Sequence, residues 1–338
     1  MKLRRIFAAV TAAALTLAAA GCAGGGAVLS CGRRSINEAQ FGYELALEKT
    51  SILNKNGYSA DNASVWSAAD SEGVTVAEAS MKELIKNESL KLYFADYAEK
   101  QGYPMNQADR DAVSSAMDNF VAGFGSRSEF DKYMDKVGVN YSMVKSMLEL
   151  QYMNQKGQQL LFGAGGSMEV TDEAAREYFE KNFITVKYVY VNNVNVTYPN
   201  GKTVPMTEAQ KAEAQRIIGE LRASLTPETM ADAQSGDGYS AAGPETVGRD
   251  SLKNAEFAKA AFAAKTGAVT EADCGDGVYF ILRLPLDKDQ LDDNKLKELK
   301  TKLTSDKLDA LYENVKDRIN VNEELLNGFS FTDGQYFS

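Results

Sequence analysis

The sequence contains no histidine, and it has only three cysteines, one tryptophan and six prolines among 338 residues. Without histidine the chain lacks the commonest general base, the usual catalytic triads and most kinds of zinc site. No Gly-rich phosphate loop is present, and the acidic run 287–293 lacks the glycine and the spacing of a calcium loop. These absences exclude the common triad, zinc and phosphate-loop chemistries, and we expect no cofactor and no metal.

The N-terminus has the pattern of an export signal. A basic start, residues 2–5, precedes an apolar stretch, residues 6–20, that is too short to span a bilayer comfortably. Small residues at 19–21 suit a signal peptidase, and Cys22 follows them directly. The arrangement resembles a bacterial lipobox, although Ala19 stands where leucine is usual. It predicts a lipoprotein signal peptide over 1–21, lipid attachment at Cys22, and an extracytoplasmic protein anchored to the cell membrane.

Two alternatives for this region stay open. Cys31, which follows Val28 to Ser30, forms a second lipobox-like sequence, and an ordinary secretory signal with an incidental Cys22 would also place the protein outside the cytoplasm. Residues 22–34 are Gly-rich without periodicity, which predicts a flexible tether. Cys31 and Cys274 are expected to be unpaired thiols, although the sequence does not forbid a disulfide between them.

The charge balance limits the possible partners. Removal of residues 1–21 takes away three basic residues and no acidic one, which leaves 34 Lys and Arg against 47 Asp and Glu and a net charge near −13. This balance excludes nucleic acid as a partner and argues against adhesion to anionic lipid through a basic patch. Any membrane association then depends on acylation. An acidic surface could loosely attract basic clients.

Hydrophobic periodicity predicts an all-helical domain over 35–165, followed by a connecting helix that begins at Thr171. Thr75 and Glu78 form a capping-box pattern, and Trp66 is expected in the loop before it. Seven methionines concentrate in this domain, and they either fill its core or line a groove for apolar segments. They are Met81, Met105, Met117, Met134, Met143, Met147 and Met153.

The period changes after residue 183. Residues 185–191 and 278–284 are β-branched, aromatic or continuously apolar, which predicts two strands with a capped helix, 207–222, between them. A hairpin is expected near 198–201 and a loop over 236–248. The last amphipathic stretch, 296–319, cannot bury its apolar stripe alone, so we expect it to pack back on the N-terminal helices.

Three motifs carry a resemblance to a known family. Glu256 to Phe262, Lys265 to Thr270 and Gly277 to Leu282 are similar to the second half of a parvulin-type (PpiC) peptidyl-prolyl isomerase domain, and the earlier strand and helix match its first half in order. The middle of that motif, Gly243 to Gly248, is degenerate. The helices before it and the segment 319–325 are similar to PrsA- and SurA-like foldases.

The resemblance implies an α+β fold. A mostly helical chaperone domain with its connecting helix would occupy 35–182, an inserted parvulin-like α/β domain would occupy 183–287, and residues 288–338 would supply a C-terminal helix that completes the helical domain.

The resemblance also implies a prolyl-binding pocket. Its positions fall in this sequence on Tyr188, Asp237, Leu252, Phe257, Cys274 and Tyr279. Tyr188 and Tyr279 stand where the family has a pair of histidines, and Phe257 retains the pocket phenylalanine. Two tyrosines could keep a hydrogen-bond network through their hydroxyls, or their larger rings could fill the pocket.

The first prediction for function is a membrane-anchored extracytoplasmic foldase or chaperone that binds unfolded or partly folded secreted polypeptides, with a weak or inactive parvulin module and no confidently assigned catalytic residue. The alternative is an active peptidyl-prolyl cis-trans isomerase of the same architecture. A third class, an adhesion or substrate-binding lipoprotein, has no positive support, because no repeat array and no aromatic sugar-binding cluster is present. A homodimer stays open.

Overall fold

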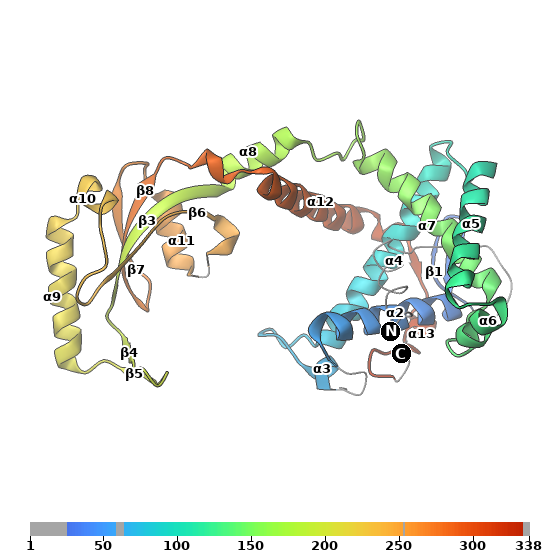
Figure 1. The fold of residues 1–338 in the computed structure, drawn as a ribbon, viewed down its shortest axis with the longest axis horizontal. Coiled ribbons are helices and arrows are strands. Elements are labelled where there is room, and N and C mark those ends of the chain that lie inside the picture. The colour runs from blue at the N-terminus through green and yellow to red at the C-terminus, as the bar shows by residue number, and fades with distance from the viewer. Residues whose placement is uncertain (1–25, 59–63, 253, 334–338) are drawn as a thin grey trace. The chain divides into compact units, whose positions relative to one another are not determined.

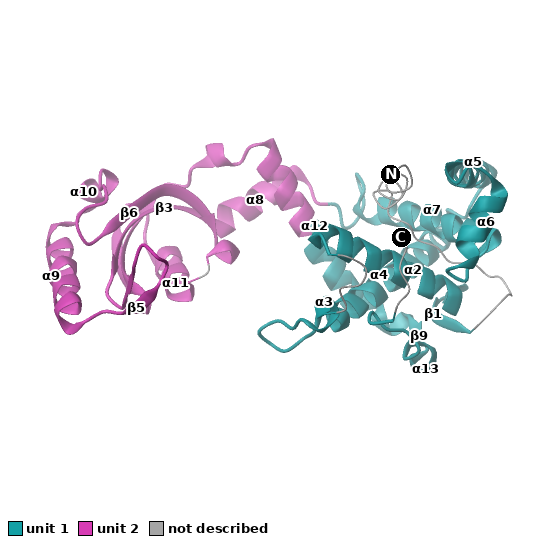
Figure 2. Cartoon of the chain, turned by 60° about the horizontal axis from the view of Figure 1, so that its bottom comes forward, with its two compact units in different colours: residues 1–169, 304–338 teal, residues 170–303 magenta. Residues whose placement is uncertain are grey.

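The computed structural model describes residues 26–58, 64–252 and 254–333, which form an α+β fold of mixed helices and strands (Figure 1). The predicted signal peptide and Cys22 lie outside the described residues. The chain divides into two compact units, unit 1 with residues 1–169 and 304–338, and unit 2 with residues 170–303 (Figure 2). No helix among the described residues has both the length and the apolar character that crossing a membrane requires.

Unit 1 is mainly helical and carries one small sheet. Its helices are α2 (Glu38–Asn56), α3 (Ser64–Ser67), α4 (Val76–Lys100), α5 (Gln107–Gly123), α6 (Arg127–Asp135), α7 (Tyr141–Phe162), the last part of α12 (Asp293–Val315) and α13 (Glu323–Leu326). The sheet has the order β2-β1-β9, from β2 (Arg34–Asn37), β1 (Ala27–Cys31) and β9 (Asn320–Val321). A short 3-10 turn, η3 (Lys316–Arg318), precedes β9.

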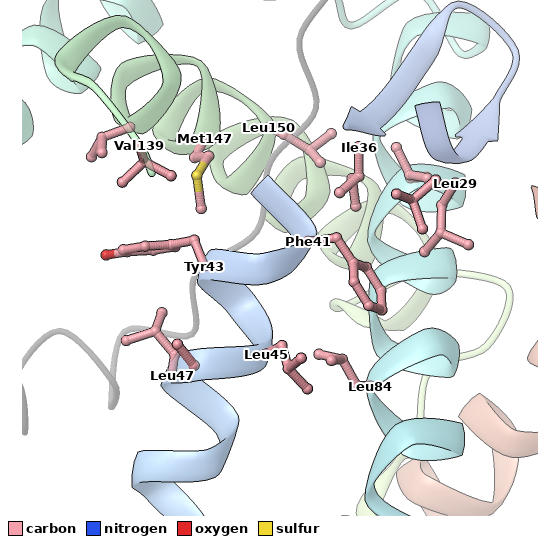
Figure 3. Close-up of a cluster of buried hydrophobic side chains, with 14 of the residues drawn as sticks. Leu29, Ile36, Phe41, Tyr43, Leu45, Leu47, Leu84, Val139, Met147 and Leu150 are labelled. Carbon is pink, nitrogen blue, oxygen red and sulfur yellow. The ribbon is translucent and has the colours of Figure 1, made fainter. Parts of the chain in front are cut away.

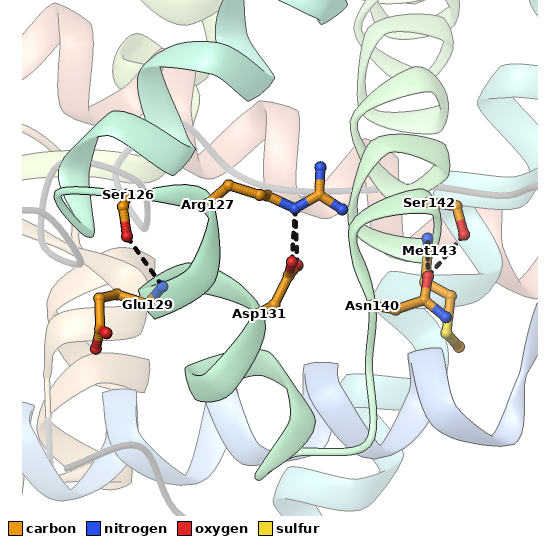
Figure 4. Close-up of polar contacts among 7 residues, drawn as sticks. All are labelled: Ser126, Arg127, Glu129, Asp131, Asn140, Ser142 and Met143. Carbon is orange, nitrogen blue, oxygen red and sulfur yellow. Dashed lines mark hydrogen bonds and ion pairs between the residues drawn. The ribbon is translucent and has the colours of Figure 1, made fainter.

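Local capping sets where the long helices begin. The predicted capping box at Thr75 is confirmed, since its side chain accepts from the Glu78 amide while the Glu78 side chain accepts from the Thr75 amide. Ser126 caps α6 and Asn140 caps α7 in the same way, each accepting from the amide three residues on (Figure 4). These side chains satisfy amide groups that the first helical turn leaves unpaired.

The core of unit 1 explains the methionine-rich composition. Met117, Met134, Met147 and Met153 are each at most 2% exposed and lie in one buried cluster with Phe41. The other methionines singled out from the sequence pack against the same cluster, and Met147 is drawn beside Tyr43 in Figure 3. These contacts support the core-filling interpretation, because flexible thioethers fill irregular gaps between helices.

Residues 27–34, expected to belong to a flexible tether, form β1 and the start of β2 instead, so that prediction is wrong for this part. Val28 and Leu29 are fully buried, and Leu29 pairs with Val321 of β9. The strands are too short to show a hydrophobic period in the sequence, and the strand with which β1 pairs, β9, lies at the other end of the chain.

Trp66, expected in a loop, lies in α3 and packs on Phe331 with ring centroids 5.2 Å apart.

The final turns of α12 pack within unit 1. Leu311 and Val315 share a buried cluster with Leu90 and Phe94 of α4. Lys307 donates to the backbone carbonyls of residues 168 and 169, at 3.2 and 3.0 Å. The apolar residues of these last turns are thus covered by α4 and by the end of α7.

Unit 2 is built on a four-stranded antiparallel sheet of order β6-β3-β8-β7. Its elements are α8 (Asp172–Asn182), β3 (Phe183–Asn192), the hairpin β4 (Asn195–Thr197) and β5 (Thr203–Pro205), α9 (Glu208–Ser224), α10 (Pro227–Ala231), β6 (Ser240–Gly248), η1 (Arg249–Ser251), α11 (Ala255–Ala263), β7 (Val269–Asp273), β8 (Gly277–Leu284) and η2 (Lys288–Gln290).

The two faces of this sheet are covered by different helices, with α9 on one side and α11 on the other (Figure 1). Alternation along β3 sends Val189 toward α9 and Val186 toward α11. The face that α11 covers only in part is the one that carries the predicted site.

Two expectations for unit 2 differ from the structure. Residues 240–248, expected within a loop, form the edge strand β6, which pairs along β3 although its sequence is rich in Gly, Ala and Pro. The expected boundaries at 182/183 and 287/288 lie at 169/170 and 303/304 in the division by contacts. The reason is that Phe179 of α8 packs on Leu296 and Leu299 of α12, which ties both helices to this unit.

Candidate aromatic binding site

Four aromatic side chains, here called the aromatic cluster, meet on one face of the unit 2 sheet: Tyr188, Tyr190, Phe257 and Tyr279. The β3–β8 register pairs Tyr190 with Tyr279 and Tyr188 with Ile281. Residues paired directly across an antiparallel ladder share a face, so this register brings the three tyrosines together. Phe257 comes from the first turn of α11, whose start is fixed because the Asn254 side chain accepts from the Phe257 amide at 3.1 Å.

The rings of the cluster touch one another. The centroid of Phe257 lies 5.3 Å from that of Tyr188 and 5.1 Å from that of Tyr279, and the two tyrosine centroids are 5.7 Å apart. Tyr190 extends the group, with its centroid 4.5 Å from that of Tyr279. Such separations are those of rings in direct contact. The space between Tyr188, Phe257 and Tyr279 is therefore filled by the rings themselves.

Burial is graded across the cluster. Phe257 is 6% exposed, whereas Tyr188, Tyr190 and Tyr279 are half-buried. Phe257 is thus covered, whereas each of the three tyrosines is partly open to solvent. The result is an aromatic surface, not an enclosed pocket among these rings.

Hydrogen bonds to the β7–β8 turn hold two of the tyrosines. The Tyr279 hydroxyl donates to Oδ2 of Asp276 at 3.1 Å, and the Tyr190 hydroxyl donates to the Asp276 carbonyl at 2.9 Å. Asn254 donates to the Cys274 carbonyl at 3.1 Å and to Oδ1 of Asp276 at 3.4 Å. The turn therefore connects the start of α11 with the aromatic cluster and uses the tyrosine donors for structure.

Tyr279 and Cys274 of the site remain protonated near neutral pH. Burial, followed by the charge of Asp276, raises the pKa of Tyr279 well above its usual value. Burial and then the carboxylates of Asp276, Asp273 and Glu256 raise the pKa of the Cys274 thiol to about 11. A thiol that stays protonated is a poor nucleophile. The site can bind through apolar and hydrogen-bonding contacts, but these groups supply neither a general base nor an activated nucleophile.

The structure brings together five of the six pocket positions expected from the resemblance. They belong to one packed cluster with Ile184, Val186 and Ile281, and they are Tyr188, Leu252, Phe257, Cys274 and Tyr279.

Asp237 does not join them. It is exposed in the segment between α10 and β6, and its neighbour Gly238 lies against Ile217 of α9, which packs on the opposite face of the sheet. Placing Asp237 at the site is therefore wrong, because the loop through which it was matched runs on the other side. Cys22 and Lys253, the residue beside Leu252, lie outside the described residues.

Sequence reasoning missed three residues of the site. Tyr190 follows Tyr188 by two positions in a strand, and this alternation could have found it. Asn254 is a typical N-cap residue, and this could have indicated its position at the start of a helix. The pattern gives no indication of its hydrogen bonds to the β7–β8 turn. Nothing local indicates that Asp276 accepts from Tyr279, since that contact depends on how the β7–β8 turn closes.

Comparison with known proteins finds no matching family model and no matching curated protein. Among solved structures, the chain is similar to the peptidylprolyl isomerase PrsA from Bacillus cereus, with 18% identity over 77% of this chain and 90% of that chain and a TM-score of 0.31. It is similar to PrsA from Bacillus anthracis, with 17% identity, coverage of 69% and 98%, and a TM-score of 0.28. The foldase protein PrsA from Streptococcus pneumoniae shows 18% identity, coverage of 71% and 86%, and a TM-score of 0.24. Because the identities and TM-scores are low, the function has to be inferred from the site itself.

Proposed function

We propose that the protein is a membrane-anchored extracytoplasmic foldase or chaperone that binds unfolded or partly folded secreted polypeptides, and that its parvulin-like unit has little or no isomerase activity. The observation that carries this proposal is the mutual contact of Tyr188, Phe257 and Tyr279. With these rings filling the space between them, no hollow for a prolyl ring is left among them.

The chemistry of proline isomerisation explains why this matters. Rotation about an X-Pro bond has a barrier of roughly 20 kcal/mol, and lowering it requires contacts that favour the twisted amide over both planar forms. A surface that touches the chain equally in every state lowers no barrier. The Tyr279 and Tyr190 hydroxyls already donate to Asp276, so these donors are not directed at a substrate amide.

The same surface suits polypeptide binding. Tyrosine combines a large apolar ring with a polar tip, and it is enriched where proteins bind other chains. Three half-buried tyrosines side by side, Tyr188, Tyr190 and Tyr279, offer such a surface to exposed apolar segments of a client.

The anchor is proposed at Cys22 and not at Cys31. An acylated cysteine becomes the mature N-terminus, so processing at Cys31 would remove Val28 and Leu29, which are fully buried in the core of unit 1. Processing at Cys22 leaves β1 whole.

The test uses the purified full-length protein in two assays. We expect it to suppress the aggregation of a chemically denatured client at near-equimolar ratios, while a refolding step limited by proline isomerisation is accelerated little or not at all. The alternative, an active isomerase, predicts strong acceleration that disappears in Phe257→Ala. That result would overturn the proposal, as would a failure to suppress aggregation.

A further inference from the structure

A second candidate site lies in unit 1. A partly open cavity of about 410 Å³ is lined by residues of α2, α4, α7 and the last part of α12. Part of its lining is apolar, from Leu84, Leu90, Phe94 and Leu308. The volume falls within the range of small-ligand sites. Nothing in the aromatic cluster of unit 2 contributes to it.

The same cavity also has charged residues in its lining. Three carboxylates line it, from Glu44 and Glu48 on α2 and Glu88 on α4, together with the ammonium groups of Lys91 and Lys55. Glu88 is 1% exposed and Glu44 is 8% exposed, whereas Lys55 is exposed. In the interior, therefore, one lysine faces an excess of carboxylates.

The ion pairs leave one acceptor without a donor. Nζ of Lys91 lies 2.5 Å from Oε1 of Glu88 and 3.9 Å from Oε2 of Glu44. Oε2 of Glu88 is buried and has no hydrogen-bond partner among the described residues. A buried carboxylate oxygen without a donor is costly, and native structures seldom retain one without a purpose. The orphaned oxygen and the excess of carboxyl groups are both features that a bound cation would relieve, because its charge would offset the cost that burial places on the ionised glutamates.

The lining fits an organic cation better than a metal ion. Among the described residues no group of His, Cys, Asp and Glu has the arrangement to hold a metal ion. The apolar wall, from Leu84 to Phe94 and Leu308, would instead cover an aliphatic stem, as lysine and arginine stems are covered when their charged ends reach a polar group.

We infer that this cavity binds one ammonium or guanidinium group carried on an aliphatic stem, with Glu88 and Glu44 as its acceptors, and that the stem belongs to a basic residue of a bound polypeptide. The cation site stands on its own, but its polypeptide source rests on the proposed function. A free alkyl amine has the same chemistry, so the experiment must separate the two sources. The acidic net charge of the chain favours the approach of a basic polypeptide and of a free amine alike.

The experiment measures binding to the full-length protein by fluorescence anisotropy. The probes are a labelled peptide, Ala-Leu-Lys-Leu-Ala, and the same peptide with norleucine in place of lysine, which removes only the ammonium group. Free cadaverine serves as the competitor. We expect the lysine peptide to bind about tenfold or more tightly than the norleucine peptide, and cadaverine to displace it.

The variants test the site directly. Glu88→Gln keeps the side-chain shape and should abolish the preference for lysine, whereas Glu83→Gln, on the exposed side of the same helix, should leave it unchanged. Ser51→Phe blocks the cavity without changing a charge, so it should weaken the binding of both the lysine peptide and cadaverine. This variant provides the test if Glu88→Gln does not fold.

Equal binding of the two peptides without any binding of cadaverine overturns the inference. So does a folded Glu88→Gln protein that retains the preference for lysine. If cadaverine binds in a Glu88-dependent manner while neither peptide binds, the cation site is supported and the polypeptide source fails together with the proposed function. If both peptides bind equally and independently of Glu88, the proposed function survives and the cation site is wrong.

Discussion

The Tyr279 hydroxyl donates to Oδ2 of Asp276 at 3.1 Å, and the ring that this bond holds lies 5.1 Å from the centroid of Phe257. A turn residue thus fixes the orientation of a ring that fills the site. The same carboxylate accepts from Asn254, the N-cap of α11, so one side chain ties a helix start to a strand. The closed state of the aromatic cluster depends on this turn as well as on the size of its rings.

Asp276→Ala should therefore lower the free energy of unfolding by about 1 kcal/mol, because Tyr279 loses its acceptor and Asn254 loses one of its two acceptors. Denaturant unfolding measures the change. Asp237→Ala is the matched control, since Asp237 is exposed and lies away from the cluster, and a change within about 0.5 kcal/mol is expected. A larger effect of Asp237→Ala on stability or on client binding would contradict its placement outside the site.

The double variant Tyr188→His with Tyr279→His should accelerate a proline-limited refolding step several-fold or more over the native protein. Imidazole rings are smaller than phenol rings, so the space among the three rings opens, and the pair of residues that the parvulin resemblance implies is restored. The matched control is Tyr188→Phe with Tyr279→Phe, which keeps the ring size and should bring no acceleration. Equal acceleration by both double variants would show that ring packing is not what limits activity.

Stability should fall as the pH rises from about 5 to about 8. Burial, only partly offset by Lys91, raises the pKa of Glu44 to about 8, and burial raises the pKa of Glu88. A carboxyl whose pKa is higher in the folded state binds more protons there than in the unfolded chain. The stability that this carboxyl contributes is therefore fully present below its ordinary pKa, and it is lost as the pH rises through the raised pKa of the folded state.

Urea unfolding at about pH 5 and about pH 8 measures this effect, and the free energy of unfolding is expected to fall by about 2 kcal/mol between them. Glu44→Gln should remove most of the loss, and Glu83→Gln should not. Carboxylates with lowered pKa values, such as Asp109, change the stability only below this pH range and therefore do not affect the comparison. A stability that is constant or rises over the range would contradict the buried state of these glutamates.

Cys22→Ala should release the protein from the membrane into the soluble fraction, because the variant lacks the thiol that is proposed to carry the acyl chains. Cys31→Ala should leave it on the membrane, since Cys31 is 4% exposed in β1 and belongs to the core. Cell fractionation with immunoblotting measures both. Membrane retention of Cys22→Ala would count against the anchor.

Local signals predicted the helices of this chain far better than its sheets. Thr75 and Asn106 cap helices through residues three positions away, and Gly57 ends α2 in a left-handed conformation, so sequence alone reveals these ends. The pairing of β1 with β9 joins opposite ends of the chain, and no short-range pattern announces it. The strand β6 was missed for the same reason, because its pairing with β3 outweighs its weak strand propensity.

The two candidate sites differ in the same way. The parvulin resemblance placed Tyr188 and Tyr279 in one expected pocket, and the β3–β8 register puts both on one face of the sheet. The unit 1 cavity was missed, although Glu88 follows the buried Leu84 by four residues and precedes the buried Leu92 by four. A charged residue on the apolar face of a helix was the available signal. This signal could not predict that Glu44, which belongs to another helix, lies in the same cavity.

The contact between α4 and α7 gives the last prediction, since Gly157 of α7 lies directly against the backbone of α4. A Cβ added there would come within 2.0 Å of the Phe94 carbonyl oxygen, a backbone atom that cannot rotate away. Gly157→Ala should therefore force α7 away from α4 and destabilise unit 1 by about 3 kcal/mol or more. Gly219→Ala is the control, because Gly219 lies inside α9 with no atom within 4 Å of the added Cβ. There alanine should stabilise the protein by about 0.5–1 kcal/mol through its better helix propensity. Thermal and denaturant unfolding measure both changes, and a neutral Gly157→Ala would mean that the helices do not pack at this distance.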